Sequence, residues 1–476
     1  MKKIVLPIFI FIGSIFSAHA QQMTLQECVK IALDNNLTVK RGVYNVETNR
    51  VGLLGAKGNF LPSLNLNTSA SQNYGRNLNP VTYQYFQGVT KTVNPSITSQ
   101  LTLFNGLRIQ NTYRQNKKSL EAADLDLEKA KNDVIINVVT NYTNVILNKE
   151  LYENAKFQLN SSQQTLERIA KQVAAGALPK SNELNQEAVV ATNETNMITQ
   201  ENAYNLSMLS LKQSMQVPAS NQFEVVVPGI AMEDLTITQT PEEIYSISSQ
   251  TLPQVRSALL KVESAQLALK AARGSYYPRL SANFAATSNY NSASDTKRYG
   301  TDPNTKVPYT IGYVNGDQSQ PVTTLVSNQY FISDSYHVKD QLTDNLYKNV
   351  GLSLSIPLFN GFQTRTGVQQ AIINRELAAI TVKETENTLR QSIETAYNNA
   401  VAAAKTYAAA TKQVNANEEA FRMTKQRYEN GAATYVEFQV SSNDLFSAKS
   451  ALSRAKFSLI LAKKILEFYQ GKTIDY

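Results

Sequence analysis

Apolar and aromatic side chains recur every seven residues along two long stretches of the chain, a pattern typical of helices that pack as coiled coils. In the first stretch the recurring positions are Val138, Val145, Tyr152, Leu159, Leu166 and Val173. In the second stretch, 255 residues later, they are Ile393, Ala400, Tyr407, Val414, Phe421 and Tyr428. No proline interrupts residues 96–178 or follows Pro357. Each stretch therefore predicts helices of about 65–70 residues, roughly 100 Å long at ~1.5 Å per residue.

A second seam along the first of these helices is less apolar. Its positions are Ile135, Tyr142, Lys149, Lys156, Gln163 and Ala170. A narrow and partly polar seam is expected of helices that wall a water-filled space. These helices taken alone fit a soluble coiled coil equally well.

Four shorter segments alternate between apolar and polar residues, which predicts β-strands. They begin near Leu64, Ile97, Leu280 and Val350, and they lie in charge-free stretches over residues 62–75, 92–107, 280–294 and 349–364. Each segment has the ~8–11 residues that a tilted strand needs to cross a bilayer, and aromatic rings cluster at the ends, as at a membrane interface. A periplasmic sheet with one wet face would alternate in the same way. The absence of charge and the aromatic ends favour membrane strands.

Four strands are too few to form a closed membrane barrel. An open sheet edge in lipid leaves backbone groups without hydrogen-bond partners, and known small membrane barrels need about eight strands or more. The pattern therefore predicts an oligomer to which each copy contributes a sector. Two copies would supply about eight strands and a filled lumen, and three would supply about twelve strands and a wider lumen.

The chain contains the same plan twice. Residues 24–64 match residues 240–280 at an offset of 216, and Leu103-Phe-Asn-Gly106 matches Leu358-Phe-Asn-Gly361 at an offset of 255. The difference in offset predicts an insertion in the polar segment 291–348. Proline before the strands and Asn-Gly after them predict the junctions between helices and strands. The expected organisation is a signal peptide over 1–20, a first repeat over 21–216, a linker over 217–240 and a second repeat over 241–476 with a long extracellular loop at 291–348.

Composition limits the chemistry that the chain could perform. Lys2 and Lys3, an apolar run too short to span a membrane and Ala18-His19-Ala20 indicate a cleaved secretory signal. The mature chain would retain His337 and Cys28 and has no Trp, so it lacks the residues for an intramolecular disulfide, a His-based triad or a His/Cys zinc site. Losing the two lysines leaves 44 of the 46 basic side chains against 38 acidic ones, and no basic run is interleaved with aromatics. We therefore expect no catalytic activity, cofactor, metal or nucleic-acid partner.

In its duplication, its Leu-Pro-x-Leu and Tyr-Pro-x-Leu strand starts, its two Leu-Phe-Asn-Gly motifs and its heptad helices, the sequence resembles the TolC-like outer-membrane efflux protein family. The resemblance covers nearly all of the mature chain. It implies a mainly α fold with membrane β-strands, in which a homotrimer forms a 12-stranded barrel in outer-membrane lipid and a periplasmic helical tunnel. It also implies an exit duct for a tripartite efflux pump or a type I secretion system. The partners would be a periplasmic adaptor and an inner-membrane transporter.

Two glycine-containing turns resemble the family's tips between paired helices. Glycine suits such a turn because a helix end often needs a positive φ. By this resemblance the adaptor-docking candidates are Ala175, Gly176, Ala177, Asn430, Gly431 and Ala432. A purely structural turn is the alternative for each glycine.

The resemblance also indicates residues at the periplasmic aperture. The candidates are Glu437, Asn182, Glu183 and Tyr428. Ala433 occupies the position of the family's basic gating residue, so that part of the polar latch is absent. A network between Tyr428 and Asn182 is one hypothesis for its replacement. A solvated Glu437 and a packed Tyr428 are the alternatives.

A channel subunit is the interpretation that uses all of these patterns. A periplasmic coiled-coil scaffold without a pore would leave the charge-free strands without a role. A carboxylate hydrolase would need a paired acidic cleft, which the sequence does not indicate. The sequence does not identify the exported substrate, since a water-filled tunnel recognises little of its cargo.

Overall fold

The computed structural model describes residues 21–79, 84–227, 239–294 and 298–472, so the expected signal peptide lies outside the described residues. The chain divides into two compact units. The first draws on residues 1–51, 117–265 and 374–476, and the second on residues 52–116 and 266–373.

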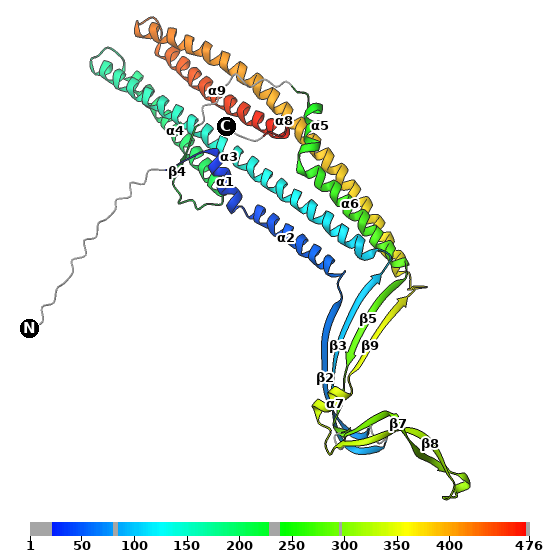
Figure 1. Ribbon diagram of the computed structural model, residues 1–476. Coiled ribbons are helices and arrows are strands. Elements are labelled where there is room, and N and C mark those ends of the chain that lie inside the picture. Colours follow the sequence, from blue (N-terminus) through cyan, green and yellow to red (C-terminus); the bar gives the residue numbers. More distant parts are fainter. Residues whose placement is uncertain (1–20, 80–83, 228–238, 295–297, 473–476) are drawn as a thin grey trace, which may run out of the picture. The chain divides into compact units, whose positions relative to one another are not determined.

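Two long helical hairpins dominate the first unit (Figure 1). Helix α3 (Arg108–Ala174) is followed by α4 (Lys180–Ser214), and α8 (Gln363–Glu429) by α9 (Tyr435–Tyr469). Both α3 and α8 contain 67 residues, and both α4 and α9 contain 35. The predicted long helices and their duplication are confirmed.

The heptad stripe packs inward in both hairpins. None of its twelve side chains is exposed, and four of them are fully buried: Val138, Val145, Ile393 and Ala400. The companion seam is partly polar, as predicted: Tyr142 is buried, whereas Lys156 and Gln163 are exposed. The residues just before Lys156, Gln163 and Ala170 are buried, namely Ala155, Ser162 and Ile169. Positions three and four residues beyond the stripe both border the same groove, and the smaller or apolar side chain of each pair packs there.

Shorter elements repeat the same plan. They are helices α1 (Leu25–Asn35) and α2 (Leu37–Gly58) in the first repeat and α5 (Pro241–Thr251) and α6 (Pro253–Arg273) in the second. Two short strands, β1 (Gln21–Met23) and β4 (Phe223–Val225), pair in parallel. Helices α1 and α5 begin with matching capping boxes, Thr24 with Glu27 and Thr240 with Glu243. One core cluster contains Val39, Val134 and Val138, and another contains their counterparts Val255, Leu389 and Ile393. Helix α2 therefore packs on α3 in the same way as α6 packs on α8.

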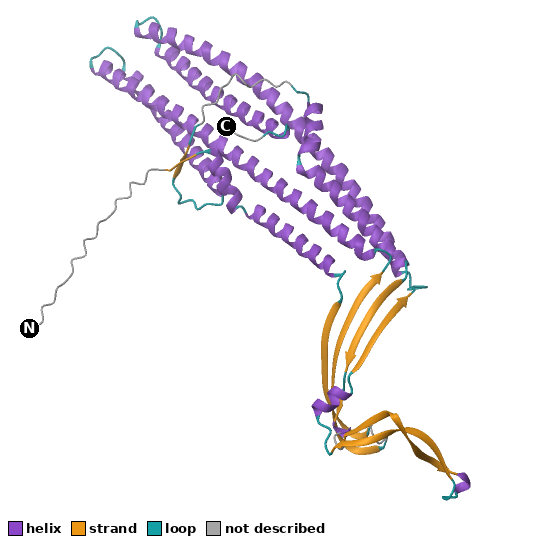
Figure 2. Cartoon of the chain, viewed as in Figure 1, coloured by secondary structure: helices purple, strands orange, loops and turns teal. Residues whose placement is uncertain are grey.

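An antiparallel sheet organises the second unit (Figure 2). Its strand order is β2 (Ser63–Leu78), β3 (Tyr85–Phe104), β5 (Arg279–Thr287) and β9 (Tyr347–Ser355), and the short β6 (Tyr290–Asn291) also pairs with β3. All four predicted strands are present. Among the described helices, none combines the length and the hydropathy needed to cross a membrane.

The predicted long loop contains regular structure. Strands β7 (Arg298–Tyr313) and β8 (Pro321–Ser333) form an antiparallel hairpin, and helix α7 (Val338–Asp344) follows it. The described residues of the second unit also form short 3₁₀ turns at Gly274–Tyr276, Ser292–Ser294 and Val314–Gly316. The charges and prolines within β7 hide its strand pattern in the sequence.

Candidate functional site

The four-stranded sheet has one apolar face and one polar face. Neighbouring cross-strand rows on the first face are Leu64–Ser99–Phe284–Val350, Leu66–Ile97–Ala286–Lys348 and Leu101–Ala282–Leu352, so this face is apolar except for Ser99 and for Lys348 near the start of β9. The alternate rows point to the other side, and they are Asn65–Thr98–Ala285–Asn349, Ser63–Gln100–Asn283–Gly351 and Thr102–Ser281–Ser353. Because side chains alternate along a strand, the register places apolar groups together on one face and polar groups on the other.

The apolar face is not covered by the rest of the chain. Val350 is 81% exposed and Leu66 is 73% exposed. In the described sheet, β2 and β9 each pair on one side only, so both outer edges present unpaired backbone groups. A contiguous exposed apolar surface of this kind marks a contact with lipid or with another protein.

A glycine contact fixes the junction between β3 and α3. Gly106 has φ +65°, and a Cβ built there would lie 2.4 Å from the Gly274 carbonyl oxygen. A Cβ at Gly274 would lie 2.7 Å from the Gly106 carbonyl oxygen. Asn105 Oδ1 accepts a hydrogen bond from the Ile109 N–H at 3.3 Å, as expected of a helix cap. The Asn-Gly motif therefore supplies both the cap and a close backbone approach.

The two hairpin tips have the same backbone geometry. Gly176 and Gly431 have φ +75° and +73°. The Ala177 N–H donates to the Gln172 carbonyl at 2.8 Å, and the Ala432 N–H donates to the Arg427 carbonyl at 2.7 Å. These are Schellman closures, so the predicted glycine turns are confirmed as structure. All six docking candidates at the tips are exposed, and their role in docking stays a prediction.

The aperture candidates all lie close to these tips, but their contacts are mainly local. Glu437 accepts a hydrogen bond from the Thr434 N–H at 2.9 Å, which completes the capping box of α9. Glu183 pairs with Lys180 at 2.8 Å. The Tyr428 ring stacks on Phe438 at a centroid distance of 4.9 Å. These contacts give Glu437 and Tyr428 structural roles, and their roles at an aperture stay predictions.

A tyrosine–amide network does join the two hairpins, through different residues from the hypothesised pair. The Tyr435 hydroxyl donates to Gln186 Oε1, and Gln186 Nε2 donates to the Ser162 carbonyl at 2.8 Å. Gln186 is buried, whereas Asn182, one turn earlier, is half-buried. Burial, and then the proximity of Tyr428, raises the pKa of Tyr435, so its hydroxyl keeps the proton that it donates. The sequence feature that could have indicated this network is Tyr435, a tyrosine in the first turn of α9, which was not among the candidates.

Replacing Tyr435 with phenylalanine is expected to loosen the tips, because it leaves the buried Gln186 oxygen without its donor. An unsatisfied buried acceptor costs about 1–3 kcal/mol, so amide exchange near the tips should quicken ~5- to 150-fold. Tyr428→Phe, which keeps the ring that stacks on Phe438, is the matched control. Equal exchange in the two variants would contradict the assigned role of the Tyr435 hydroxyl.

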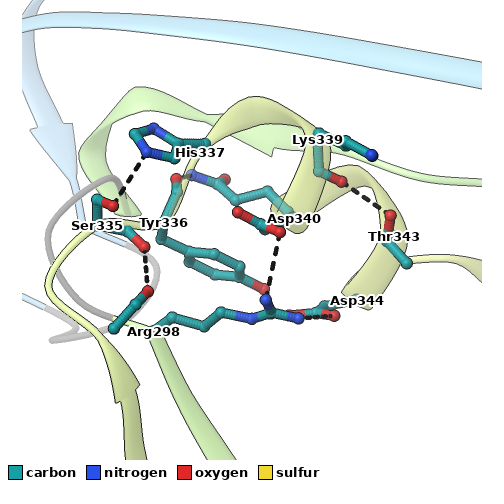
Figure 3. A network of polar contacts seen from close by, with 10 residues as sticks. Arg298, Ser335, Tyr336, His337, Lys339, Asp340, Thr343 and Asp344 are labelled. Atoms are coloured by element: carbon teal, nitrogen blue, oxygen red, sulfur yellow. Dashed lines mark hydrogen bonds and ion pairs between the residues drawn. The ribbon is translucent and has the colours of Figure 1, made fainter.

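A second polar network joins β7 to α7 (Figure 3). Arg298 donates to both carboxylate oxygens of Asp344 at 2.9 Å and to Asp340 Oδ1 at 3.2 Å. The hydrogen bond to Asp344 raises the pKa of Arg298. The Tyr336 side chain lies beside these groups, and burial raises its pKa. His337 precedes α7 and lies 3.0 Å from Ser335 Oγ through Nε2, so the network holds the insertion together.

Comparisons with known proteins agree with this geometry. A family model described as "Outer membrane efflux protein" matches residues 29–215 and 244–472. The alkaline protease secretion protein AprF of Pseudomonas aeruginosa is 22% identical over 93% of this chain and 83% of its own. The pyoverdine export outer membrane protein OpmQ of the same organism is 20% identical over 74% of this chain. The match covers 64% of the length of OpmQ.

Solved structures share the fold at low sequence identity. The outer membrane protein VceC of Vibrio cholerae matches with a TM-score of 0.72 and 15% identity, over 95% of this chain and 97% of its own. The CmeC outer membrane channel of Campylobacter jejuni matches with a TM-score of 0.73 and 16% identity, over 94% and 85%. The arrangement of long helices and strands is therefore that of known outer-membrane channels.

Proposed function

Because the chain belongs to the outer membrane efflux protein family, we propose that three copies form one channel-tunnel that exports material from the cell. Membership places the protein in the outer membrane, within a family of transport channels. The observation that carries the proposal is the four-stranded sheet, with its exposed apolar face, its polar opposite face and its two unpaired edges.

Physical chemistry connects this sheet to a pore. Unpaired backbone groups cannot remain in lipid, so β2 and β9 must pair with strands of neighbouring copies. Three copies would close a barrel of about twelve strands, wide enough for a water-filled lumen. The apolar rows would then face lipid, and the Ser, Thr, Asn and Gln rows would line the lumen.

The long helices would extend the duct through the periplasm. A helix of 67 residues reaches about 100 Å. The exposed tips at Ala175–Ala177 and Asn430–Ala432 would dock a periplasmic adaptor that connects the duct to an inner-membrane transporter. Glu437, Asn182, Glu183 and Tyr428 lie close enough to these tips to line a periplasmic aperture.

The cargo follows from the transporter with which the duct works. The names of the two relatives associate one with export of pyoverdine and the other with secretion of a protease. We propose that this duct likewise serves either an efflux pump for small molecules or a type I secretion system for proteins. The proposal requires no catalytic step in this chain.

Electrophoresis of the outer-membrane fraction tests the proposal. Unheated samples should migrate as a trimer and boiled samples as a monomer. The purified trimer should also open conducting channels in a planar bilayer. A folded monomer that stays in solution without detergent would contradict the proposal.

A further inference from the structure

Three basic residues lie on the apolar face of the sheet, each on a different strand. They are Arg76 on β2, Lys91 on β3 and Lys348 on β9. The register assigns them to this face, because each lies an even number of residues from an apolar member of a row on its own strand. Within the described sheet, this face carries no other charged side chain.

All three residues lie towards the same end of the sheet. The long helices join the strands at Ser63, Phe104 and Ser355, and the opposite end of the sheet is called the outer end below. Arg76 is two residues from the outer end of β2, and Lys348 is the second residue of β9. Lys91 lies in the outer half of β3. The basic residues therefore border the apolar face on the side away from the helices.

The sheet supplies no carboxylate partner for these basic groups. Each of the three adjoins the charge-free segment of its own strand. Asp and Glu are absent from residues 48–120, 264–294 and 345–375, which include all four strands of the described sheet. An apolar face with a purely basic border is complementary to a ligand that is both apolar and anionic.

The basic border is open on one face of the sheet and supported on the other. All three side chains are exposed. The Arg76 guanidinium lies 4.3 Å from the centroid of the Tyr85 ring, a stacking contact that leaves the N–H groups at its edge available to a ligand. On the opposite face Thr90 is only 3% exposed, and the Lys91 backbone N–H donates to Ser292 Oγ of the insertion at 2.9 Å.

The chemistry of this border matches the phosphate groups of a lipid. Lysine and arginine at the end of a membrane segment cover apolar surface with their stems and place their charges at the level of the headgroups. Arginine can hold a phosphate through two N–H groups, and lysine attracts it as a point charge. Near an anionic lipid surface, each such side chain adds about fivefold in affinity.

We propose that Arg76, Lys91 and Lys348 bind the phosphate groups of lipopolysaccharide, whose acyl chains lie against the apolar rows of the sheet. This phosphorylated glycolipid forms the outer leaflet of the outer membrane, and the three basic residues lie at the outer end of the sheet. The inference rests on the proposed function, which places the long helices in the periplasm and the apolar face in lipid. It adds a binding site for one class of lipid.

Native mass spectrometry of the detergent-purified trimer tests the site. The probes are lipid A with both phosphates, lipid A with both phosphates removed, and phosphatidylglycerol. Lipid A should bind most tightly, and removal of its phosphates should weaken binding at least tenfold. The triple variant Arg76→Gln, Lys91→Gln and Lys348→Gln should bind intact lipid A about 100-fold more weakly.

Two control variants separate the position of the charge from its presence. Arg279→Gln also removes one basic group from the sheet, but Arg279 pairs with Ser355 at the helix end and donates to Thr102 on the polar face at 3.3 Å. It should leave the affinity for lipid A unchanged. Lys91→Arg with Lys348→Arg keeps both charges and should bind lipid A as tightly as the unsubstituted trimer.

The outcomes distinguish the inference from the function on which it rests. A conducting trimer that binds lipid A equally well with and without the three basic side chains would overturn the site and leave the proposed function standing. Equal affinity for phosphatidylglycerol and lipid A would overturn the choice of lipid. If the unsubstituted chain forms no trimer, the proposed function fails first.

Single substitutions keep the test decisive if the triple variant does not assemble. Arg76→Gln, Lys91→Gln and Lys348→Gln should each weaken lipid A binding about fivefold. Unchanged binding in all three single variants would contradict the site.

Discussion

Replacing Leu352 with arginine is expected to remove most of the assembled protein from the outer membrane. Leu352 lies in the row Leu101–Ala282–Leu352 on the apolar face of the sheet. An arginine on the lipid side costs about 2–4 kcal/mol near the bilayer centre, and three copies would carry the cost three times. The amount of heat-dissociable trimer in outer-membrane fractions measures the effect.

Ser353→Arg is the matched control, one residue further along the same strand. Ser353 belongs to the row Thr102–Ser281–Ser353 on the polar face. A lumenal arginine remains solvated, so the trimer should persist while single-channel recordings shift towards anion selectivity. Similar losses of trimer in both variants would contradict the assignment of the two faces.

Periodicity predicted the elements that depend on local pattern. The seven-residue stripe ending at Val173 and at Tyr428 marks α3 and α8, and the alternation from Leu64 and from Val350 marks two strands of the sheet. These features succeed because burial of one face repeats with the period of the element itself. The duplication strengthened these predictions, because the same pattern of helices and strands occurs in both repeats.

Contacts between residues distant in the sequence were not predictable in this way. The insertion is ordered by Arg298, whose partners Asp340 and Asp344 lie on a helix that follows a complete hairpin. Tyr435 and Gln186 come from different hairpins, and a sequence pattern specifies neither the pair nor its geometry. In α3, positions three and four residues beyond the stripe both border the groove, and the sequence pattern did not indicate that Ala155, Ser162 and Ile169 would be the buried ones.

The repeat boundaries and the compact units describe different properties. The boundaries at 21–216 and 241–476 come from sequence matches and stay a prediction. The two compact units each combine segments from before and after the linker. Each compact unit therefore contains the corresponding parts of both sequence repeats. In the first unit, for example, the core cluster around Val138 belongs to the first repeat and the matching cluster around Ile393 to the second.

A single added methyl group is expected to destabilise the folded chain most at the junction between β3 and α3. Gly106→Ala combines a positive φ, which costs an L-residue roughly 1–2 kcal/mol, with a Cβ only 2.4 Å from the Gly274 carbonyl oxygen. Backbone atoms cannot rotate away as a side chain can, and forced overpacking adds about 1–3 kcal/mol. We therefore expect destabilisation of about 2–5 kcal/mol and rapid proteolysis of the newly made chain.

Gly176→Ala is the control that separates the cost of the positive φ from the cost of overpacking. Gly176 has a similar φ of +75°, but a Cβ there meets nothing within 4 Å, so only the conformational cost of roughly 1–2 kcal/mol applies. Pulse-chase measurement of chain half-life and urea unfolding in detergent compare the two variants. Gly106→Ala should be the less stable by at least ~1 kcal/mol, since the close approach to Gly274 adds to the strain. Equal stability would mean that the backbone around Gly274 can yield, and that the close approach of the two glycines is not required for the fold.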